Sequence, residues 1–344
     1  MLKASHGLAT YASQPPLPSK ILTLNSKGSH PFWRERTVLL EGYPEHRAGW
    51  RPFHRSGIRD IYWGWRLFRK SKQFNAVFTA NERASWVFAL LQLLFRRRQR
   101  VLHIQIDFIW IPAQSKIREV FKRYLFSLEH RTVSKLVVFS RAQARRYAAY
   151  FPFAASKFTT IPFHPTVYNT PLETADWGYV FAGGDSARDY KSLIEAVRGL
   201  PFTLIIAAFR RDHFSLIENL PPNVDIISAE PASYIRFMAR AAVVVVPMQK
   251  ELFRVVGHQT YLNAMTLGKP VIVTDDSDAS EYIQNGVDGF VVPPGDSPAL
   301  RSVLDQLMRD SLLRERVGKA ARATARKYSP EMFFERLFAL AQSN

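Results

Sequence analysis

Short apolar runs alternate with helical patterns along nearly the whole chain. In the first half, five runs read as strands, over residues 21–24, 37–40, 76–79, 101–106 and 136–139. Helical patterns accompany them over residues 60–72, 83–95, 117–129 and 141–150, and Ser140 stands at the N-cap position of the last one. Strand and helix in regular succession predict a parallel sheet with helical crossovers.

The alternation breaks between Phe151 and Trp177, where four prolines occur with little periodicity, and we interpret this segment as a linker. A second series follows, with strands expected over 178–182, 203–207, 224–227, 243–246, 271–274 and 289–292. Its helices are expected over 190–198, 233–240, 261–267, 279–285, 298–310, 313–327 and 330–342. A chain of 344 residues has room for two domains. We predict an α/β fold of two doubly wound, Rossmann-like domains facing each other across a cleft.

Nearly all of the excess positive charge lies in the first half. Residues 1–170 hold 28 Lys and Arg against 8 Asp and Glu, a net charge of +20. The remainder holds 19 against 21, a net charge of −2. This asymmetry indicates an anionic partner for the first half, namely nucleic acid, an anionic membrane surface or an acidic substrate.

The chain contains no cysteine, which excludes disulfides, thiolate metal sites and cysteine nucleophiles and fits a reducing cytoplasm. No apolar signal segment follows Met1, so we expect no secretory signal. The longest apolar stretch, residues 86–95, is half the length of a membrane span and is followed by the basic run 96–100. It reads either as a buried helix with a solvated end or as a surface helix on anionic lipid.

Two glycine-containing segments of the second half suggest a phosphate site. Gly183 and Gly184 follow an apolar strand, where ligands bind in open α/β sheets, and Arg188 and Lys191 follow as cations suited to a pyrophosphate. Gly257 precedes the helix expected over 261–267 and exposes N–H groups at the positive end of the helix dipole. Polar side chains gather around the start of that helix, at His258, Gln259, Thr260 and Asn263.

The segment from Val244 to Asp296 resembles the donor-binding domain of family-4 glycosyltransferases. The resemblance rests on two strings, Asn263-Ala264-Met265 through Gly268-Lys269-Pro270 to Thr274, and Glu281-Tyr282-Ile283 through Gly286 and Gly289 to Asp296. It covers about fifty residues tightly and, loosely, the whole second half, whereas the first half is similar only in its strand–helix order.

The resemblance implies the GT-B fold and fixes the expected domain limits. These are an acceptor-side domain at 1–170, a nucleotide-sugar domain at 171–328 and a helix at 329–344 that crosses back to the first domain. It implies that Arg188 and Lys191 clamp the donor diphosphate, with Gly183, Gly184 and the start of the helix after Gly257. It further implies retention of anomeric configuration and chemistry without a metal or other cofactor.

One departure from the family pattern concerns its two glutamates eight positions apart. The second falls on Asn263, which could still contact ribose hydroxyls as a neutral group. The first falls on Val255, which cannot contact a sugar, and Glu251 in the same loop is a substitute. This departure leaves open a catalytically inactive GT-B scaffold.

Candidate site residues in the first half lie within or just after two strands. His103 lies within the run 101–106 and Asp107 follows it, near the edge where family members place a polar residue beside the donor sugar. A histidine inside a strand is more often a core residue. The segment 81–83 follows the strand at 76–79 and is a candidate acceptor loop.

We therefore expect a hexosyltransferase-type enzyme that moves a sugar from a nucleotide-diphosphate donor to a lipid-linked or polysaccharide acceptor. Its location would be cytoplasmic, peripheral on the inner face of the membrane. The alternatives are the inactive scaffold and a nucleic-acid-binding protein that uses the basic half. Nucleic acid is disfavoured, because no helix-turn-helix, zinc or RRM signature occurs.

Overall fold

A computed structural model describes residues 21–24, 31–41, 57–80, 83–95, 101–168, 172–210, 214, 219–275 and 278–342. Contacts between residues divide the chain into two units. The first comprises Met1–Ile106 with Leu128–Ser134, and the second comprises Asp107–Ser127 with Lys135–Asn344. The domain limits expected from the sequence stay a prediction, since this grouping rests on contacts alone.

The strands of the described residues form two parallel sheets of six strands each. In the first unit the order is β2-β1-β3-β4, with bounds β1 Ile21–Thr23, β2 Thr37–Leu39, β3 Ala76–Thr79 and β4 Leu102–Gln105. In the second unit β5 (Lys135–Val138) pairs with β6 (Phe158–Thr160).

The second sheet lies wholly in the second unit and has the order β12-β11-β10-β7-β8-β9. Its strands are β7 Val180–Gly183, β8 Leu204–Ala207, β9 Val224–Ile227, β10 Val243–Val246, β11 Val271–Thr274 and β12 Phe290–Val292. Both sheets confirm the α/β class expected from the alternation of strands and helices.

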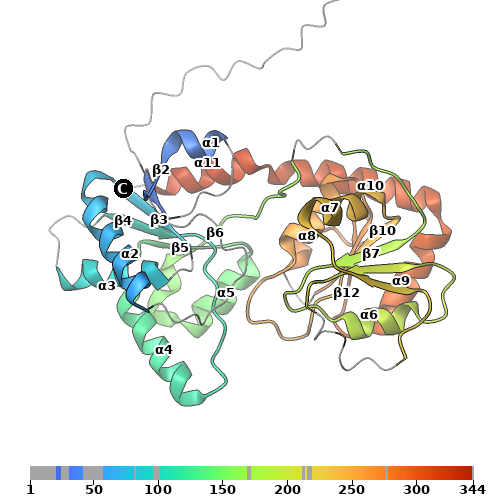
Figure 1. The fold of residues 1–344 in the computed structure, drawn as a ribbon, viewed down its shortest axis with the longest axis horizontal. Helices are drawn as coiled ribbons and strands as arrows, with labels where there is room; N and C mark the ends of the chain where they lie inside the picture. The colour runs from blue at the N-terminus through green and yellow to red at the C-terminus, as the bar shows by residue number, and fades with distance from the viewer. Residues whose placement is uncertain are drawn as a thin grey trace, which may run out of the picture. The chain divides into compact units, whose positions relative to one another are not determined.

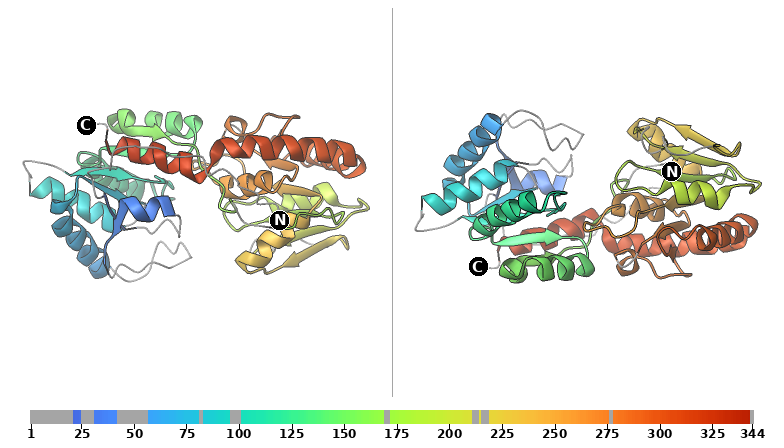
Figure 2. Two further views of the ribbon diagram at one scale, coloured as in Figure 1. Left: turned by 90° about the horizontal axis from the view of Figure 1, so that it is seen from above. Right: turned by 90° about the horizontal axis from the view of Figure 1, so that it is seen from below.

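Helices cover both faces of the second sheet (Figure 1). On one face, α6 (Tyr190–Val197) and α9 (Ser297–Arg309) bury leucine and isoleucine side chains against β7, β8 and β10. On the other, α7 (Pro231–Arg240) buries Met238, α8 (His258–Thr266) buries Ala264, and Leu267 at the C-cap of α8 joins them. The second unit ends in α10 (Ser311–Ala325) and α11 (Pro330–Leu340), which follow one another closely in Figure 2.

The first unit is built in the same way on a smaller scale. Its described helices are α1 Pro31–Arg36, α2 Gly57–Lys70 and α3 Arg83–Leu94. Leu67 and Phe88 pack with Val77 of β3, whereas Trp33 of α1 stacks on the next strand residue, Phe78, at 5.8 Å between ring centroids. Successive strand residues point to opposite faces, so α1 covers one face and α2 and α3 cover the other.

Three expectations for local structure were wrong or incomplete. The helix expected over 279–285 is a single 3-10 turn, Ala279–Glu281, because Asp288 accepts the Gln284 N–H at 2.7 Å and replaces a helical bond. Within the expected linker, Pro152–Lys157 is a 3-10 helix and β6 pairs with β5. The short helix α1 was not expected.

The apolar stretch at 86–95 forms most of α3, and most of its side chains are buried or half-buried. This arrangement favours the interpretation as a packed helix. The basic run 96–100, like residues 81 and 82 of the candidate acceptor loop, lies outside the described residues. In the described part of the chain no helix is long and apolar enough to cross a bilayer.

Candidate active site

The turn after β7 brings backbone close to a buried cation. Gly184 has φ 104°, a conformation that side chains rarely adopt. A Cβ on Gly183 would lie 2.4 Å from the Tyr234 ring, and one on Gly184 would lie 3.0 Å from Nη2 of Arg188. Both positions therefore require glycine.

Arg188 is 5% exposed and joins this turn to the start of α8. Its Nε donates to the Gly183 carbonyl at 3.1 Å, Nη1 donates to the Ser186 carbonyl at 2.8 Å, and Nη2 donates to Oγ1 of Thr260 at 3.3 Å. Nη1 also lies 3.1 Å from the Met248 sulfur. Every one of these partners is neutral, and within the described ranges no carboxylate pairs with the guanidinium. A buried cation without a counter-charge favours an anionic ligand.

The start of α8 lies beside the same guanidinium. Gly257, its N-cap, has φ 90°, and a Cβ there would meet Val246 at 3.1 Å, Met248 at 3.2 Å and Arg188 at 3.8 Å. The N–H groups of His258 and Gln259 are in the first turn, so no carbonyl within the helix can accept them. The structure thus brings together Gly183, Gly184, Arg188, Gly257 and Thr260, all five of them residues chosen from the sequence.

Three of the other residues predicted to bind the donor, Lys191, Gln259 and Asn263, lie apart from this cluster or are engaged elsewhere, whereas His258 lies in the first turn of α8. Lys191 is exposed on the first turn of α6. Asn263 is buried and accepts from the N–H of Thr166 at 2.7 Å, while Nδ2 of Asn263 donates to Oγ1 of Thr166 at 2.9 Å. Gln259 donates to the same hydroxyl at 3.2 Å. Asn263 and Gln259 therefore fasten α8 to the chain around Thr166, and their contact with a donor stays a prediction.

Arg254 is a second cation of the site that the sequence did not single out. Its Nη2 donates to Oγ of Ser186, in the turn that carries Arg188, at 2.8 Å. Burial lowers the pKa of Arg254, and the positive charge of Arg188 lowers it further. Electrostatic interactions with Tyr147 and Asp107 raise the same pKa and oppose this shift. Its place three residues before Gly257 was the only signal available in the sequence.

A pocket of about 210 Å³ lies beneath the loop that contains Arg254. It is lined by residues of that loop, by His258 and Tyr261 of α8, by Asp275 and Asp278, and by Arg146. Both Nε2 of His258 and the Tyr261 hydroxyl are buried without a hydrogen-bond partner among the described residues. Burial lowers the pKa of His258 to about 4, although the negative charge of Asp278 acts to raise it. Burial also raises the pKa of the Tyr261 hydroxyl. Both groups are therefore neutral near pH 7, and two buried polar atoms without a partner are unusual in a folded interior.

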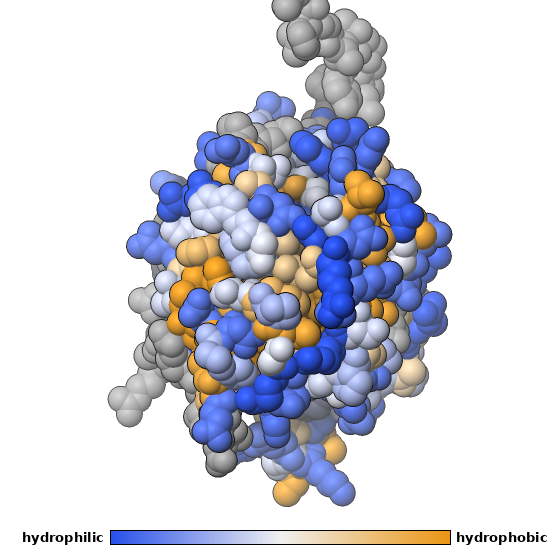
Figure 3. Space-filling view, turned by 90° about the vertical axis from the view of Figure 1, so that its right-hand side faces the viewer, coloured by the Kyte–Doolittle hydropathy of each residue, from blue (hydrophilic) through white to orange (hydrophobic). Residues whose placement is uncertain are grey.

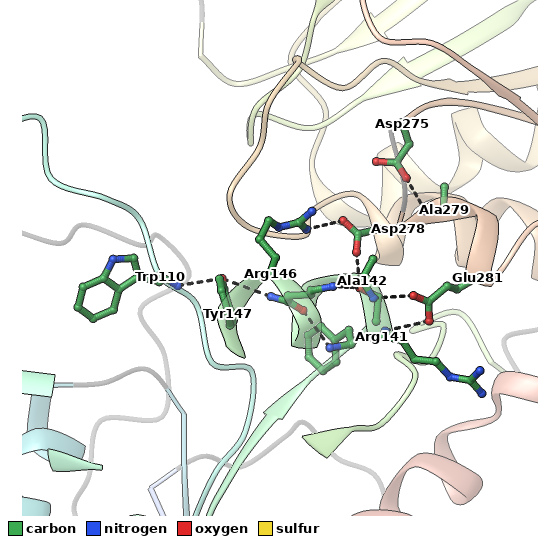
Figure 4. Close-up of polar contacts among 12 residues, drawn as sticks. Trp110, Arg141, Ala142, Arg146, Tyr147, Asp275, Asp278, Ala279 and Glu281 are labelled. Atoms are coloured by element: carbon green, nitrogen blue, oxygen red, sulfur yellow. Dashed lines mark hydrogen bonds and ion pairs between the residues drawn. The ribbon is translucent and has the colours of Figure 1, made fainter. Parts of the chain in front are cut away.

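The wall of this pocket is fastened to α5 (Arg141–Tyr150), as Figure 4 shows. Arg146 pairs with Asp278 at 2.7 Å, and the Ser140 hydroxyl donates to the same carboxylate. Glu281 accepts from the backbone N–H of Arg141 at 2.9 Å and of Ala142 at 2.7 Å. The hydroxyl of Ser140 also accepts from the Gln143 N–H, which confirms it as the expected N-cap. Two acidic side chains thus stabilise the positive end of α5.

The three predicted catalytic residues occupy different surroundings. His103 is fully buried in the first unit, with Nε2 2.9 Å from Oγ1 of Thr79 and 3.3 Å from Oγ of Ser85. Asp107 is half-buried, has φ 59°, and acts electrostatically on Arg254. Glu251 is exposed, has φ 55°, and lines the pocket.

Comparison with known sequences identifies the region that contains this site. Residues 186–324 match the family described as glycosyl transferases group 1. This part of the chain is similar to the group 1 glycosyltransferases. Two curated proteins show related sequences. The alpha-D-kanosaminyltransferase of Streptomyces kanamyceticus is 27% identical over 240 residues, which are 69% of this chain and 52% of that protein. The capsular polysaccharide biosynthesis glycosyltransferase CapM of Staphylococcus aureus is 33% identical over 129 residues, 37% of this chain and 32% of that protein. The chain matches about half of the first relative and a third of the second.

Solved structures extend the similarity to the fold of nearly the whole chain. Anabaena HepE, solved in complex with UDP-glucose, superimposes with a TM-score of 0.69 at 17% identity, covering 95% of this chain and all of that one. A mutant of S. aureus TarM, solved with fondaparinux, alpha-GlcNAc-glycerol and UDP, gives a TM-score of 0.65 at 17% identity, covering 83% of this chain and 58% of that one. The fold is GT-B, as the sequence resemblance implied.

Proposed function

We propose that the protein transfers a sugar from a nucleotide-diphosphate donor to a lipid-linked or polysaccharide acceptor, with retention of configuration and without a metal. The observation that supports this most strongly is the buried guanidinium of Arg188, which lies between two glycine turns and the start of α8 and has only neutral partners. It occurs inside the region similar to the group 1 glycosyltransferases, where a nucleotide sugar is the expected ligand.

In the proposed reaction the bond from the sugar C1 to the diphosphate oxygen breaks with its electron pair left on that oxygen, C1 bonds to an acceptor hydroxyl oxygen, and the hydroxyl proton passes to the departing diphosphate. As the bond breaks, negative charge collects on the departing diphosphate. Arg188, Arg254 and the free N–H groups of α8 would stabilise this charge in place, so the site needs no reorganisation as the bond breaks. These fixed positive groups take the role that a metal ion has in other transferases.

We assign the donor sugar to the pocket beneath the Arg254 loop. His258 and Tyr261 line it as neutral buried groups, and Glu251 and Asp278 add carboxylates, a combination that suits sugar hydroxyls. Asp107 and Glu251 are the catalytic candidates that we retain. His103 is not retained, because Thr79 and Ser85 occupy its Nε2 in the interior of the first unit.

The remaining expectations form part of the same proposal. Residues 171–328 would hold the nucleotide, residues 1–170 would hold the acceptor, and the basic first half would contact an anionic membrane on its cytoplasmic side. The return of the last helix is supported by Phe333 of α11, whose ring lies 6.4 Å from both Phe139 and Phe163. Both partners belong to the expected first domain.

The direct test is a thermal-shift screen of the full chain against UDP-, GDP- and ADP-sugars, followed by a transfer assay with the donor that stabilises it. A donor at a hundred times its dissociation constant adds about 2.7 kcal/mol to the unfolding free energy. Stabilisation by one nucleotide class, with sugar transfer to a lipid-linked or glycan acceptor, supports the proposal. No stabilisation by any nucleotide sugar would overturn it.

A second candidate, a GT-B scaffold that binds a donor without transferring it, is favoured by one observation. Val255 stands where the resemblance places a sugar-contacting glutamate, and it is 8% exposed in the pocket wall. If the screen finds a donor, release of the free sugar or its transfer separates the enzyme from the scaffold. The variant Val255→Glu would restore activity to a scaffold that lacks only this group.

A further inference from the structure

Helix α4 (Lys116–Glu129) presents an apolar surface to solvent. Ile117, Val120, Phe121 and Tyr124 are 83%, 68%, 61% and 59% exposed. Their spacing of three, four and seven residues places them along one side of the helix, and we call them the α4 apolar stripe. By contrast, Figure 3 shows a face of the molecule where small apolar areas are scattered among hydrophilic side chains.

The opposite side of α4 is fixed to the second unit, so the stripe cannot turn inward. Phe126 is fully buried, and its ring packs 4.8 Å from that of Phe151, the residue that follows α5. Glu119 accepts from Nε1 of Trp110 at 2.8 Å and from the Tyr150 hydroxyl at 2.7 Å.

Two further contacts anchor the flank of the helix. Lys122 donates to the Ile111 carbonyl at 2.6 Å and lies 3.9 Å from the centre of the Trp110 ring. Arg123 donates to the Tyr150 carbonyl at 3.0 Å. A helix held this firmly with its apolar side outward has an exposed face that folding alone does not explain.

The charges beside the stripe select the partner. Lys116 and Arg118 are both exposed, and they lie about 100° to either side of Ile117 on the helix circumference. Cations that flank an apolar face suit a surface with an apolar interior and anionic groups at its boundary.

We propose that α4 lies in the plane of an anionic lipid membrane. The α4 apolar stripe enters the acyl boundary, and Lys116 and Arg118 contact the headgroups. This inference rests on the membrane contact in the proposed function and names its site, but it does not depend on sugar transfer.

The test uses the full chain and vesicles of phosphatidylcholine with or without ~30% phosphatidylglycerol, with sedimentation as the measure. The variant Val120→Ser/Phe121→Ser should reduce binding to anionic vesicles about tenfold or more, since it removes two inserted side chains. Lys116→Gln/Arg118→Gln should reduce it about tenfold or more at low salt, because each cation contributes to the attraction. The matched control is Leu312→Ser, which removes an apolar side chain that is 76% exposed on α10; it should bind like the parent chain.

A second measurement reports insertion itself. Because the chain has no cysteine, Ile117→Cys and Leu312→Cys can each carry one environment-sensitive dye. The dye at 117 should shift to the blue with anionic vesicles, and the dye at 312 should not. Unchanged vesicle binding by both double variants, or equal dye responses, would overturn the role of α4.

The outcome for α4 is separable from that for the enzyme. Donor affinity of the α4 variants, measured without vesicles, should equal that of the parent chain. A parent chain that binds no donor yet loses vesicle binding in the α4 variants contradicts the proposed function and supports the role of α4. A dimeric parent that ignores vesicles and becomes monomeric in Val120→Ser/Phe121→Ser would assign the stripe to a second copy instead and overturn the inference.

Discussion

Arg188 in the second unit and His103 in the first are both buried polar residues, both singled out from the sequence, and their surroundings differ in kind. Arg188 carries a permanent charge among neutral oxygens, next to glycine backbone and the start of a helix. His103 has two hydroxyl neighbours and a phenylalanine ring against it. The comparison teaches that burial alone is weak evidence for a site, whereas a buried charge without a counter-charge favours an anionic ligand.

The largest effect is expected at Gly257, where backbone conformation and space both exclude a side chain. Gly257→Val should lower the unfolding free energy by roughly 3–5 kcal/mol, because it adds left-handed strain to the contacts with Val246 and Met248. Gly199→Val is the matched control, since Gly199 has φ 72° with open space around it, and should cost roughly 1–2 kcal/mol. Equal losses in urea unfolding would mean that the space beside Arg188 is not restricted.

The buried His258 predicts a pH dependence of stability. Its pKa is about 4 in the folded chain against about 6.5 when unfolded, so protons bind the unfolded state first as the pH falls. The contribution of neutral His258 to the unfolding free energy is complete above pH 6.5 and is lost as the pH falls from 6.5 to 4. The loss amounts to on the order of 3 kcal/mol. His258→Gln should remove this part of the pH dependence, measured as the difference in unfolding free energy between variant and parent. Parallel pH curves would contradict the neutral buried state.

His103 should prove structural. His103→Leu leaves Thr79 and Ser85 to bond each other and should cost about 2 kcal/mol of stability. Donor affinity and the rate of transfer should stay within about twofold of the parent at a temperature where the variant is folded. A loss of turnover with unchanged stability would instead return His103 to the catalytic group.

The ion pair of Arg146 and Asp278 should give the smallest effect, because the Arg146 side chain is 28% exposed and water can hydrate its charge when the carboxylate is removed. Asp278→Asn keeps the contact with Ser140 and should cost about 1 kcal/mol. Asp305→Asn, which breaks an exposed ion pair with Arg309, is the control. It should lower the unfolding free energy by roughly a few tenths of a kcal/mol. A loss at Asp278 as small as at Asp305 would show that the fastening of the pocket wall to α5 contributes little.

What the sequence predicted well was encoded locally. Strand β3 and helix α5 have the expected bounds, and the cap at Ser140 is confirmed, because apolar period and cap chemistry act over a few residues. Gly184 and Gly257 stand out because their positive φ favours glycine, and Gly183 stands beside Gly184 in the same turn.

What the sequence did not predict depends on contacts across long stretches of chain. Glu281 caps a helix 139 residues earlier, and Arg254 reaches Ser186 over 68 residues, and no local pattern reports either contact. The short strand β6 has no apolar run of its own and exists because β5 pairs with it. The exposed face of α4 reads in sequence like any amphipathic helix; only its anchored underside shows that the apolar side faces outward.

The central claim is that Arg188 binds the donor diphosphate, and calorimetric titration of UDP, GDP and ADP tests it most directly. The chains to compare are the parent, Arg188→Gln and the control Arg309→Gln, each checked for folding by circular dichroism. Arg309 is an exposed arginine of the same domain, on α9. Loss of the charged hydrogen bonds should weaken binding of the preferred nucleotide about 100-fold in Arg188→Gln and leave the control unchanged. An unchanged dissociation constant in folded Arg188→Gln would contradict the phosphate site and, with it, the proposed enzyme.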